Sequence, residues 1–218
     1  MPQIKILKNQ GLILHENDTY RLSDIGKLVV GNMLPLLNIL GVIEENKEYW
    51  ANRETSVIPN NLLMRLGEIG ECRVIEPDLN HLFDLPREFT ENLVKSRYIM
   101  SYLTYYHPLY PLLYSKLAED GAEMELMLTR AIFERLTEDF ADKLESLLNS
   151  KNTTVQICDE NLKLPTIVVT EKFMYLCLFE KQGRYDHKVV MSFDQSALRW
   201  GKELFIHYKN SYRQATET

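Results

Sequence analysis

The sequence lacks the short motifs that mark the common enzyme classes. It contains no GxGxxG or GxxxxGK(S/T) phosphate-binding loop, no GxSxG nucleophile turn and no HExxH zinc motif. These motifs place backbone amides, a nucleophile or metal ligands at fixed spacing, so their absence removes the usual nucleotide-binding, hydrolase and zinc-enzyme classes. We therefore expect no cofactor, no bound metal and no catalytic residues.

Cysteine is scarce, and long apolar runs are missing. Cys72, Cys158 and Cys177 form no CxxC pair and are odd in number, which favours reduced, buried thiols over a disulfide framework. No apolar run reaches the roughly 18 residues of a membrane span. Met1 is followed by polar and basic residues without a signal-peptide core. We therefore expect a cytoplasmic protein that does not enter a membrane.

Composition and charge place the chain among globular proteins. Its 218 residues are 45% hydrophobic and 26% charged, which is enough apolar material for a core. The net charge of −6 argues against nucleic-acid binding over the whole surface. The first thirty residues differ, because they carry four Lys or Arg against three Asp or Glu, a balance of +1. A local basic surface at the N-terminal end therefore stays open.

The centre of the chain predicts a βαβ unit. Tyr98–Leu103 and Met124–Leu128 are short apolar runs typical of strands buried on both faces. Leucines at helical spacing predict a helix over Pro108–Ala118, which Asp120-Gly121 ends. Strand, helix and strand at this spacing predict two parallel strands with a right-handed crossover.

The flanking sequence predicts further strands and helices. Thr166–Thr170 and Tyr175–Phe179 predict an antiparallel hairpin, and Trp200 is expected at the edge of a closing helix over Ser196–Tyr208. The remaining strands are predicted at Cys72–Glu76, Thr154–Cys158 and Val189–Phe193, and the remaining helices after Pro59, at Phe89–Lys95 and over Ala131–Leu148.

The N-terminal residues predict a helix followed by a hairpin. Pro2–Asn9 has a helical pattern that Gly11 ends, and Asn17-Asp18 suits the turn of a hairpin between Leu12–Glu16 and Thr19–Leu22. The next segment is a strongly apolar helix. Ser23 predicts its N-cap, Pro35 is expected to kink or break it near its middle, and more helix is expected over Val42–Ala51.

The order of helix, glycine, hairpin and capped helix resembles the second half of a winged helix-turn-helix domain. The residues that carry this resemblance are IKILKNQGLILHENDTYRLSDIGKLV, from Ile4 to Val29. The resemblance implies that the first helix reads DNA and that the hairpin is the wing. The two helices that precede them in such domains are missing, which predicts a truncated winged helix with weak or lost DNA binding, or a piece of a longer chain. The alternative is a hairpin arm used only for packing or dimerisation.

The resemblance implies a set of DNA contacts on the N-terminal element. Polar and basic groups there suit phosphate contacts, and such contacts weaken steeply with salt. The predicted DNA-binding residues are Gln3, Lys5, Lys8, His15 and Arg21.

From about Leu36 to Tyr212 the chain resembles the sensor half of an archaeal family of winged-helix transcription regulators, the methanogenesis-regulatory proteins. The segments that match the family occur in the same order along the chain: ENKEYW (45–50), IP (58–59), RLGEIGECRVIEPD (65–78), LFDLPREFTENLVKS (82–96), GRYD (183–186), SFD (192–194) and WGKELF (200–205). The resemblance implies an α+β fold in three parts: a partial winged helix at 1–31, a helical connector at 32–70, and an α/β-type sensor domain with a mixed sheet at 71–218. It also implies a small-molecule ligand, and the apolar helix over Ile25–Leu40 suits a homodimer interface.

The sheet domain is also similar to one half of a phospholipase-D-like fold. Enzymes of that fold need a His-x-Lys pair and an Asp five residues further on. The corresponding positions, near Lys163–Thr166 and Thr170–Glu171, contain no histidine. The prediction is therefore a regulator and not an enzyme. The alternatives are an interaction protein without DNA binding and an enzyme with an unrecognised site.

The candidate ligand site lies after the first strand of the βαβ unit, where open α/β sheets bind ligands. Tyrosines and a histidine gather there, which suits a small, partly apolar ligand, although the same residues would also pack in a core. Polar residues near other strand ends are expected to converge with them, although each is also a common cap or turn residue. The predicted ligand-binding residues are Ser101, Tyr102, Tyr105, Tyr106, His107, Thr129, Asp159, Thr170 and Ser192.

The residues that follow the Gly183 turn have two interpretations. Arg184, Asp186 and His187 suit an anion or metal site, and they equally suit a solvated hairpin tip.

Overall fold

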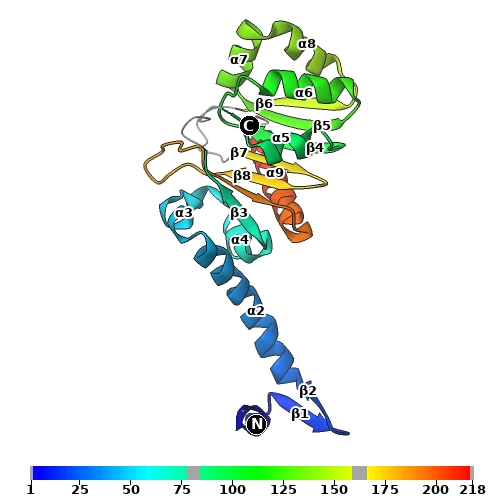
Figure 1. The fold of residues 1–218 in the computed structure, drawn as a ribbon. Helices are drawn as coiled ribbons and strands as arrows, with labels where there is room; N and C mark the ends of the chain where they lie inside the picture. Colours follow the sequence, from blue (N-terminus) through cyan, green and yellow to red (C-terminus); the bar gives the residue numbers. More distant parts are fainter. Residues whose placement is uncertain (1, 78–83, 159–165, 217–218) are drawn as a thin grey trace.

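The N-terminal element stands apart from the rest of the protein. A computed structural model describes residues 2–77, 84–158 and 166–216. In it, α1 (Pro2–Asn9), β1 (Ile13–Glu16) and β2 (Thr19–Leu22) form a small unit at the far end of the long helix α2 (Asp24–Glu45). The opposite end of α2 meets a domain built on a sheet (Figure 1). The structure therefore has three parts: a head (residues 2–22), a neck formed by α2, and a body that contains the sheet and the helices packed on it. The predicted boundary at residues 31 and 32 falls inside α2.

Local sequence determines the geometry of the hairpin. Asn17 and Asp18 adopt φ angles of 50° and 58°, the left-handed pair that a tight two-residue hairpin turn requires. The Ser23 hydroxyl accepts a hydrogen bond from the Gly26 amide at 2.9 Å, which confirms the predicted N-cap of α2. A Cβ on Gly26 would lie 2.0 Å from the Leu12 carbonyl oxygen. Only glycine allows this approach, so the hairpin is packed directly against the first turn of α2.

The helix α2 is longer than the sequence predicted. It runs from Asp24 to Glu45 without interruption at Pro35, where a kink or break was expected. The chain turns at Asn46 into the short helix α3 (Lys47–Asn52), so the helix predicted over Val42–Ala51 is divided between the two. The Trp50 indole N–H donates to the Val42 carbonyl oxygen at 3.1 Å, which closes α3 against the last turns of α2.

A mixed sheet of seven strands forms the body, and its order is β3-β9-β8-β7-β4-β5-β6. Strands β4, β5 and β6 are parallel, which confirms the predicted βαβ unit, and β7 and β8 form the predicted antiparallel hairpin. Strands β3 and β9 continue the sheet in antiparallel order. The strand bounds are β3 (Cys72–Ile75), β4 (Tyr98–Leu103), β5 (Glu123–Thr129), β6 (Thr153–Cys158), β7 (Thr166–Thr170), β8 (Met174–Cys177) and β9 (Val189–Ser192).

Helices cover both faces of this sheet, which explains why its strands are apolar on both sides. Side chains from α5 (Arg87–Leu93), α6 (Tyr110–Glu119), α7 (Arg130–Asp139) and α8 (Ala141–Asn149) form one core with the sheet. On the other face, a second core joins the sheet to α9 (Gln195–Thr216), the end of α2, α3, α4 (Asn60–Leu63) and the short 3-10 helices η1 (Thr55–Val57) and η2 (Leu66–Ile69).

Trp200 corrects one prediction. It was expected at the edge of the closing helix, yet its side chain is fully buried and its indole N–H donates to the Leu62 carbonyl oxygen at 2.9 Å. A buried carbonyl satisfies the polar end of the ring, so the whole side chain enters the core.

Two helical glycines allow a matched test of the packing between α9 and the sheet. A Cβ on Gly201 would lie 2.9 Å from side-chain carbons of Met174 and Val169, whereas a Cβ on Gly41 would meet nothing within 4 Å. We expect Gly201→Ala to lower the free energy of unfolding by about 1–3 kcal/mol, because the core there has no room. Gly41→Ala should raise it by about 1 kcal/mol, the difference in helix propensity. Urea unfolding of both variants measures this, and equal stabilisation by the two would contradict the packing described.

Candidate functional site

A cavity opens at the sheet edge where β3, β4 and β8 end. Its volume is about 260 Å³. Strands β3 and β8 run parallel to β4. Every pairing between neighbours from β3 to β4 is antiparallel, and an even number of such pairings separates each of the two strands from β4. The cavity therefore lies beyond the carboxyl ends of strands, where ligands bind in open α/β sheets. The residues that line this tyrosine cavity are Ile75, Glu76, Pro77, Asp84, Leu85, Pro86, Arg87, Tyr105, His107, Tyr175, Tyr185 and His187.

Aromatic rings and phenol hydroxyls form the inner wall of the tyrosine cavity. The Tyr105 and Tyr110 hydroxyls are 2.8 Å apart, and the Tyr105 ring lies 4.5 Å from that of Tyr185. The Tyr185 ring in turn lies 4.3 Å from the His187 ring. Burial raises the pKa of Tyr105, Tyr175 and Tyr185 above the ordinary range. The phenols therefore stay neutral, and they offer hydrogen bonds and apolar surface to a ligand but no charge.

Charged residues occupy the rim and are largely paired. Glu76 forms an ion pair with Lys188 at 2.6 Å, and Arg87 forms one with Glu91 at 2.6 Å. Inside the rim, the His107 Nδ1 accepts a hydrogen bond from the Leu109 amide at 3.2 Å. This combination suits a small, partly apolar molecule with a few hydrogen-bonding groups.

Two predicted ligand residues lie in the cores instead. Ser101 and Tyr102 are neighbours in β4, so their side chains point to opposite faces of the sheet. The Ser101 and Tyr114 hydroxyls are hydrogen-bonded at 2.6 Å, and Tyr102 packs near Tyr208 in the other core. Both residues are fully buried. The Ser101 hydroxyl is thus used in a hydrogen bond inside the core and does not face the cavity.

The expected convergence of strand-end residues is not found. Thr170 pairs with Ile99 at the start of β4, and Ser192 pairs with Cys72 at the start of β3, so both lie at the opposite sheet edge. Thr170 Oγ1 accepts from the Lys172 and Phe173 amides. The Ser192 hydroxyl donates to the backbone carbonyl oxygens of Ile69, at the end of η2, and of Glu71. Strands β7 and β9 run antiparallel to β4, and the sequence prediction had not used their direction.

Three further predicted residues have other positions. Thr129 caps α7, since its hydroxyl accepts from the Ile132 amide at 3.5 Å. Tyr106 turns away from the tyrosine cavity, and its ring lies 4.2 Å beneath the Arg135 guanidinium. Asp159 lies outside the described residues. Of the nine predicted ligand residues, the structure brings together Tyr105 and His107 at the cavity.

The segment after Gly183 holds the residues that the sequence analysis missed. Tyr185 and His187 line the tyrosine cavity, whereas Asp186 forms an ion pair with the buried guanidinium of Arg53. Burial is the largest single influence and would raise the pKa of Asp186, but the hydrogen bonds and positive charges of Arg53 and Lys188 together hold that pKa below its ordinary value. Arg184 is exposed at the tip of the turn, as one interpretation predicted, whereas Asp186 is paired inside the protein and His187 lines the cavity. The family resemblance included the segment GRYD (183–186), which could have indicated that this turn matters. Nothing near Arg53 in the sequence indicated that Asp186 is its partner.

The predicted DNA-binding residues lie on the head. Gln3, Lys5 and Lys8 are exposed on α1, which buries none of its side chains. On the hairpin, Arg21 forms an ion pair with Glu16 at 2.8 Å, and the His15 ring stacks on Tyr20 at 4.4 Å. The helix lysines are the groups best placed to meet a phosphate backbone.

Metal binding receives no support from the described residues. Within 2–77, 84–158 and 166–216, no group of three or more His, Cys, Asp or Glu side chains has a geometry that could hold a metal ion.

Comparison with known proteins places the chain in a family. The model described as methanogenesis regulatory protein FilR1, middle domain, matches residues 82–211. The chain belongs to this family. The match covers more than half of the sequence, and it includes α9 up to residue 211, most of the sheet and the cavity-lining residues from Asp84 onward, but not Ile75, Glu76 and Pro77. It confirms the predicted resemblance to the methanogenesis-regulatory proteins.

Individual proteins and solved structures that resemble this chain extend the comparison beyond the family model. The methanogenesis regulatory protein FilR1 of Methanothrix harundinacea (strain 6Ac) is 26% identical over 219 residues, which cover 98% of this chain and 49% of that protein. The chain thus spans about half the length of this curated relative. TrmBL2, described as an archaeal chromatin protein with a novel mode of DNA binding, shares the fold at a TM-score of 0.52 and 14% identity, over 95% of this chain and 78% of TrmBL2. A polyphosphate kinase from Porphyromonas gingivalis gives a TM-score of 0.33, which is too low to bear on fold or activity.

Proposed function

We propose that this chain is a cytoplasmic transcription regulator, or part of one, without enzymatic activity. In this proposal residues 71–218 sense a small ligand, residues 32–70 connect, and residues 1–31 are a winged-helix element that contacts DNA. Membership of the FilR1 family carries the proposal, since the named relative is a regulatory protein. The fold shared with TrmBL2, a protein described as binding DNA, supports it.

The head supports the DNA-binding part of the proposal. An exposed helix followed by a tight hairpin matches the order of recognition helix and wing in winged-helix domains. The head projects from the body on α2 (Figure 1), so α1 and the hairpin tip are accessible to a duplex. Lys5 and Lys8 are exposed, and the ion pairs within described residues 2–27 are Arg21–Glu16 and Lys27–Asp24.

The DNA contact predicts a salt-dependent affinity. Fluorescence anisotropy with DNA from upstream of the gene should show binding at low salt, and the Lys5→Gln, Lys8→Gln double variant should weaken it at every sequence tested. Each lost phosphate contact should reduce the slope of log affinity against log salt by about 1. Lys172→Gln, an exposed change in the turn between β7 and β8, is the control and should bind like the wild type. Absence of binding by the wild type at low salt would contradict the DNA-contacting role.

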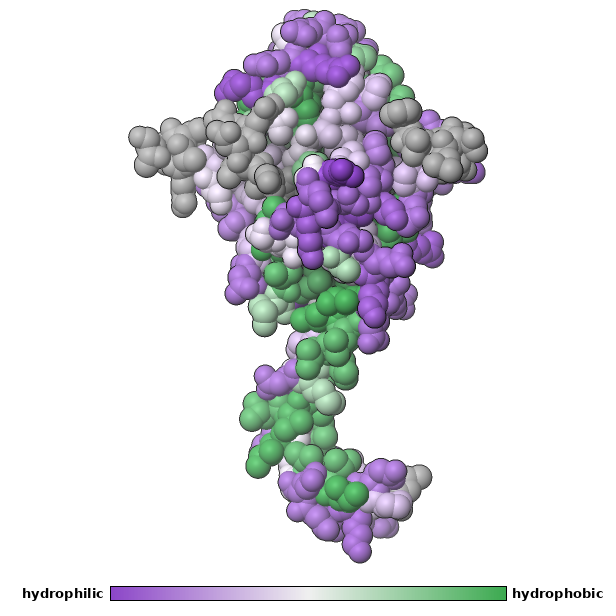
Figure 2. All heavy atoms as spheres, turned by 90° about the vertical axis from the view of Figure 1, so that its left-hand side faces the viewer, coloured by the Kyte–Doolittle hydropathy of each residue, from purple (hydrophilic) through white to green (hydrophobic). Residues whose placement is uncertain are grey.

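The neck supports a homodimer. Large apolar side chains of α2 face solvent, and Figure 2 shows them as a continuous hydrophobic surface between the head and the body. The exposed residues Val29, Met33, Leu36 and Leu40 follow one another at spacings of four, three and four residues, the pattern of a coiled-coil seam. A second copy of this chain, related by a two-fold axis, would cover that seam.

Length and composition alone permit a second interpretation of the neck. Within the described residues, α2 is a helix long and apolar enough to cross a membrane. The heptad spacing favours the second copy over a bilayer.

The dimer predicts that a charge in the seam separates the subunits. Leu36→Glu places a carboxylate at a core position of the coiled coil, where burying it is costly, and should give monomers in sedimentation velocity experiments. Leu34→Glu is the matched control, because Leu34 is similarly exposed (50% against 56%) but points away from the seam. The control should stay dimeric. A monomeric wild type, or a wild type that sediments with lipid vesicles, would contradict the dimer.

The tyrosine cavity supports the sensing part of the proposal. Its volume of about 260 Å³ lies just below the roughly 300–1,000 Å³ typical of sites for drug-sized ligands, which favours a single small molecule. The neutral phenols and the two histidine rings select for hydrogen-bonding groups on an apolar frame.

A ligand screen by thermal shift tests the cavity. A compound that binds there should raise the melting temperature of the wild type, since a ligand at about a hundred times its Kd adds about 2.7 kcal/mol of stability. Tyr105→Ala should abolish that response, because it removes part of the cavity wall. Tyr106→Ala is the neighbouring control outside the tyrosine cavity and should keep it. Equal responses in the wild type and Tyr105→Ala would place the ligand elsewhere.

A further inference from the structure

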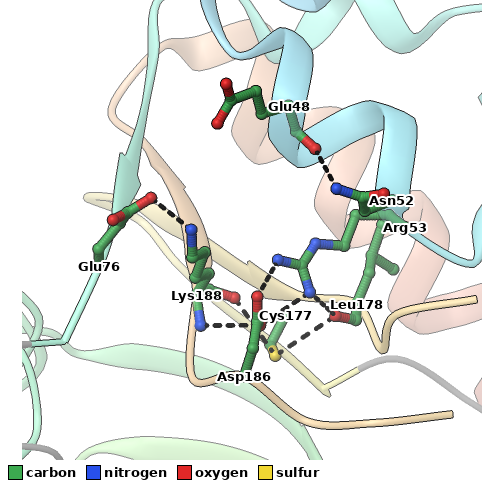
Figure 3. Close-up of polar contacts among 8 residues, drawn as sticks. All are labelled: Glu48, Asn52, Arg53, Glu76, Cys177, Leu178, Asp186 and Lys188. Atoms are coloured by element: carbon green, nitrogen blue, oxygen red, sulfur yellow. Dashed lines mark hydrogen bonds and ion pairs between the residues drawn. The ribbon is translucent and has the colours of Figure 1, made fainter. Parts of the chain in front are cut away.

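Arg53 follows α3, the short helix at the base of the neck, and anchors it to the body through a buried ion pair. Its side chain is 2% exposed, and its guanidinium donates to both carboxylate oxygens of Asp186 and to the Leu178 carbonyl oxygen (Figure 3). The Tyr49 ring lies 4.2 Å from the guanidinium carbon. A buried charge is costly without its partner, so Arg53 keeps its position only while Asp186 keeps its own.

Backbone bonds fasten the same joint. The Glu54 amide donates to the Phe179 carbonyl oxygen at 2.9 Å, and the Lys181 amide donates to the Asn52 carbonyl oxygen at 3.0 Å. These bonds tie the end of α3 to the chain that leaves β8. Because Trp50 in α3 is bonded to Val42 in α2, the end of α2 is held through the same contacts.

Asp186 lies in the chain between two residues of the cavity wall. The residues on either side of it, Tyr185 and His187, line the cavity, whereas the Asp186 side chain points to Arg53. His187 has a φ of 61°, an uncommon conformation for a residue other than glycine. Asp186 further accepts from the Lys188 amide, and the Lys188 ammonium pairs with Glu76 of the cavity rim. Figure 3 shows this continuous path from Glu76 through Lys188 and Asp186 to Arg53.

We propose that the Arg53–Asp186 ion pair transmits the state of the tyrosine cavity to α3 and α2. A molecule in the cavity meets Tyr185 and His187, and any shift of these residues moves the Asp186 carboxylate that lies between them. Arg53 follows its counter-charge, and the end of α3 follows Arg53. This inference rests on the proposed sensing function, and it identifies Arg53 and Asp186 as positioning residues that touch no ligand themselves.

A mutant cycle tests the coupling without a ligand and without DNA. His187→Gly loosens the cavity wall, because glycine removes the ring and tolerates the left-handed φ at no cost. Amide hydrogen exchange in residues 47–53 of the full chain is the readout. We expect His187→Gly to speed this exchange about fivefold, the lower end of typical coupling between sites. In the Asp186→Asn background the same change should have no further effect, because the ion pair is already broken.

Controls make each outcome decisive. Arg184→Gly alters the same turn at an exposed side chain and should leave the exchange of residues 47–53 unchanged. If Asp186→Asn does not fold, the Arg53→Met, Asp186→Leu double variant removes both charges together and replaces it as the uncoupled background. Equal effects of His187→Gly with and without the ion pair, or no effect in either, would overturn the proposal. Neither result would touch the ligand screen or the DNA measurement, so the sensing function is judged separately.

Discussion

The buried guanidinium of Arg53 imposes a condition on the body of the molecule. A charge removed from water has to meet an opposite charge in good geometry, and Asp186, 133 positions further along the chain, provides it. The segment that carries Asp186 must therefore turn back under α3, which brings Tyr185 and His187 to the mouth of the sheet. The neck, the last strands and the cavity wall thus share one electrostatic contact.

Local patterns in the sequence were sufficient for the elements that depend on near neighbours. Asn17 and Asp18 predicted the hairpin, Ser23 predicted the helix cap, and two apolar runs around a leucine helix predicted the parallel strands β4 and β5. Short segments spread over the chain carried the family resemblance, and the match to residues 82–211 confirms it. Each of these features can be recognised without knowing where distant segments meet.

Which residues meet at the tyrosine cavity depends on strand direction and on contacts between distant segments, and no short stretch of sequence specifies these. Thr170 and Ser192 were placed near strand ends correctly, but the antiparallel direction of β7 and β9 puts those ends at the opposite edge. Ser101 and Tyr102 could have been separated by the alternation of side chains along a strand. The Arg53–Asp186 contact could not, because an arginine in a polar stretch and an aspartate in a turn are ordinary surface residues until the fold joins them.

The close packing of Gly26 against the hairpin has a mechanical consequence. It fixes the head to the first turn of α2, so the head and the neck move as one body. A helix of 22 residues is about 33 Å long at a rise of 1.5 Å per residue. A tilt of about 5° at its base displaces the far end by about 3 Å. That is close to the roughly 3.4 Å step between base pairs along one DNA strand. In the proposed coupling, a tilt of about 5° at the base of α2 would therefore shift the head by about one base-pair step.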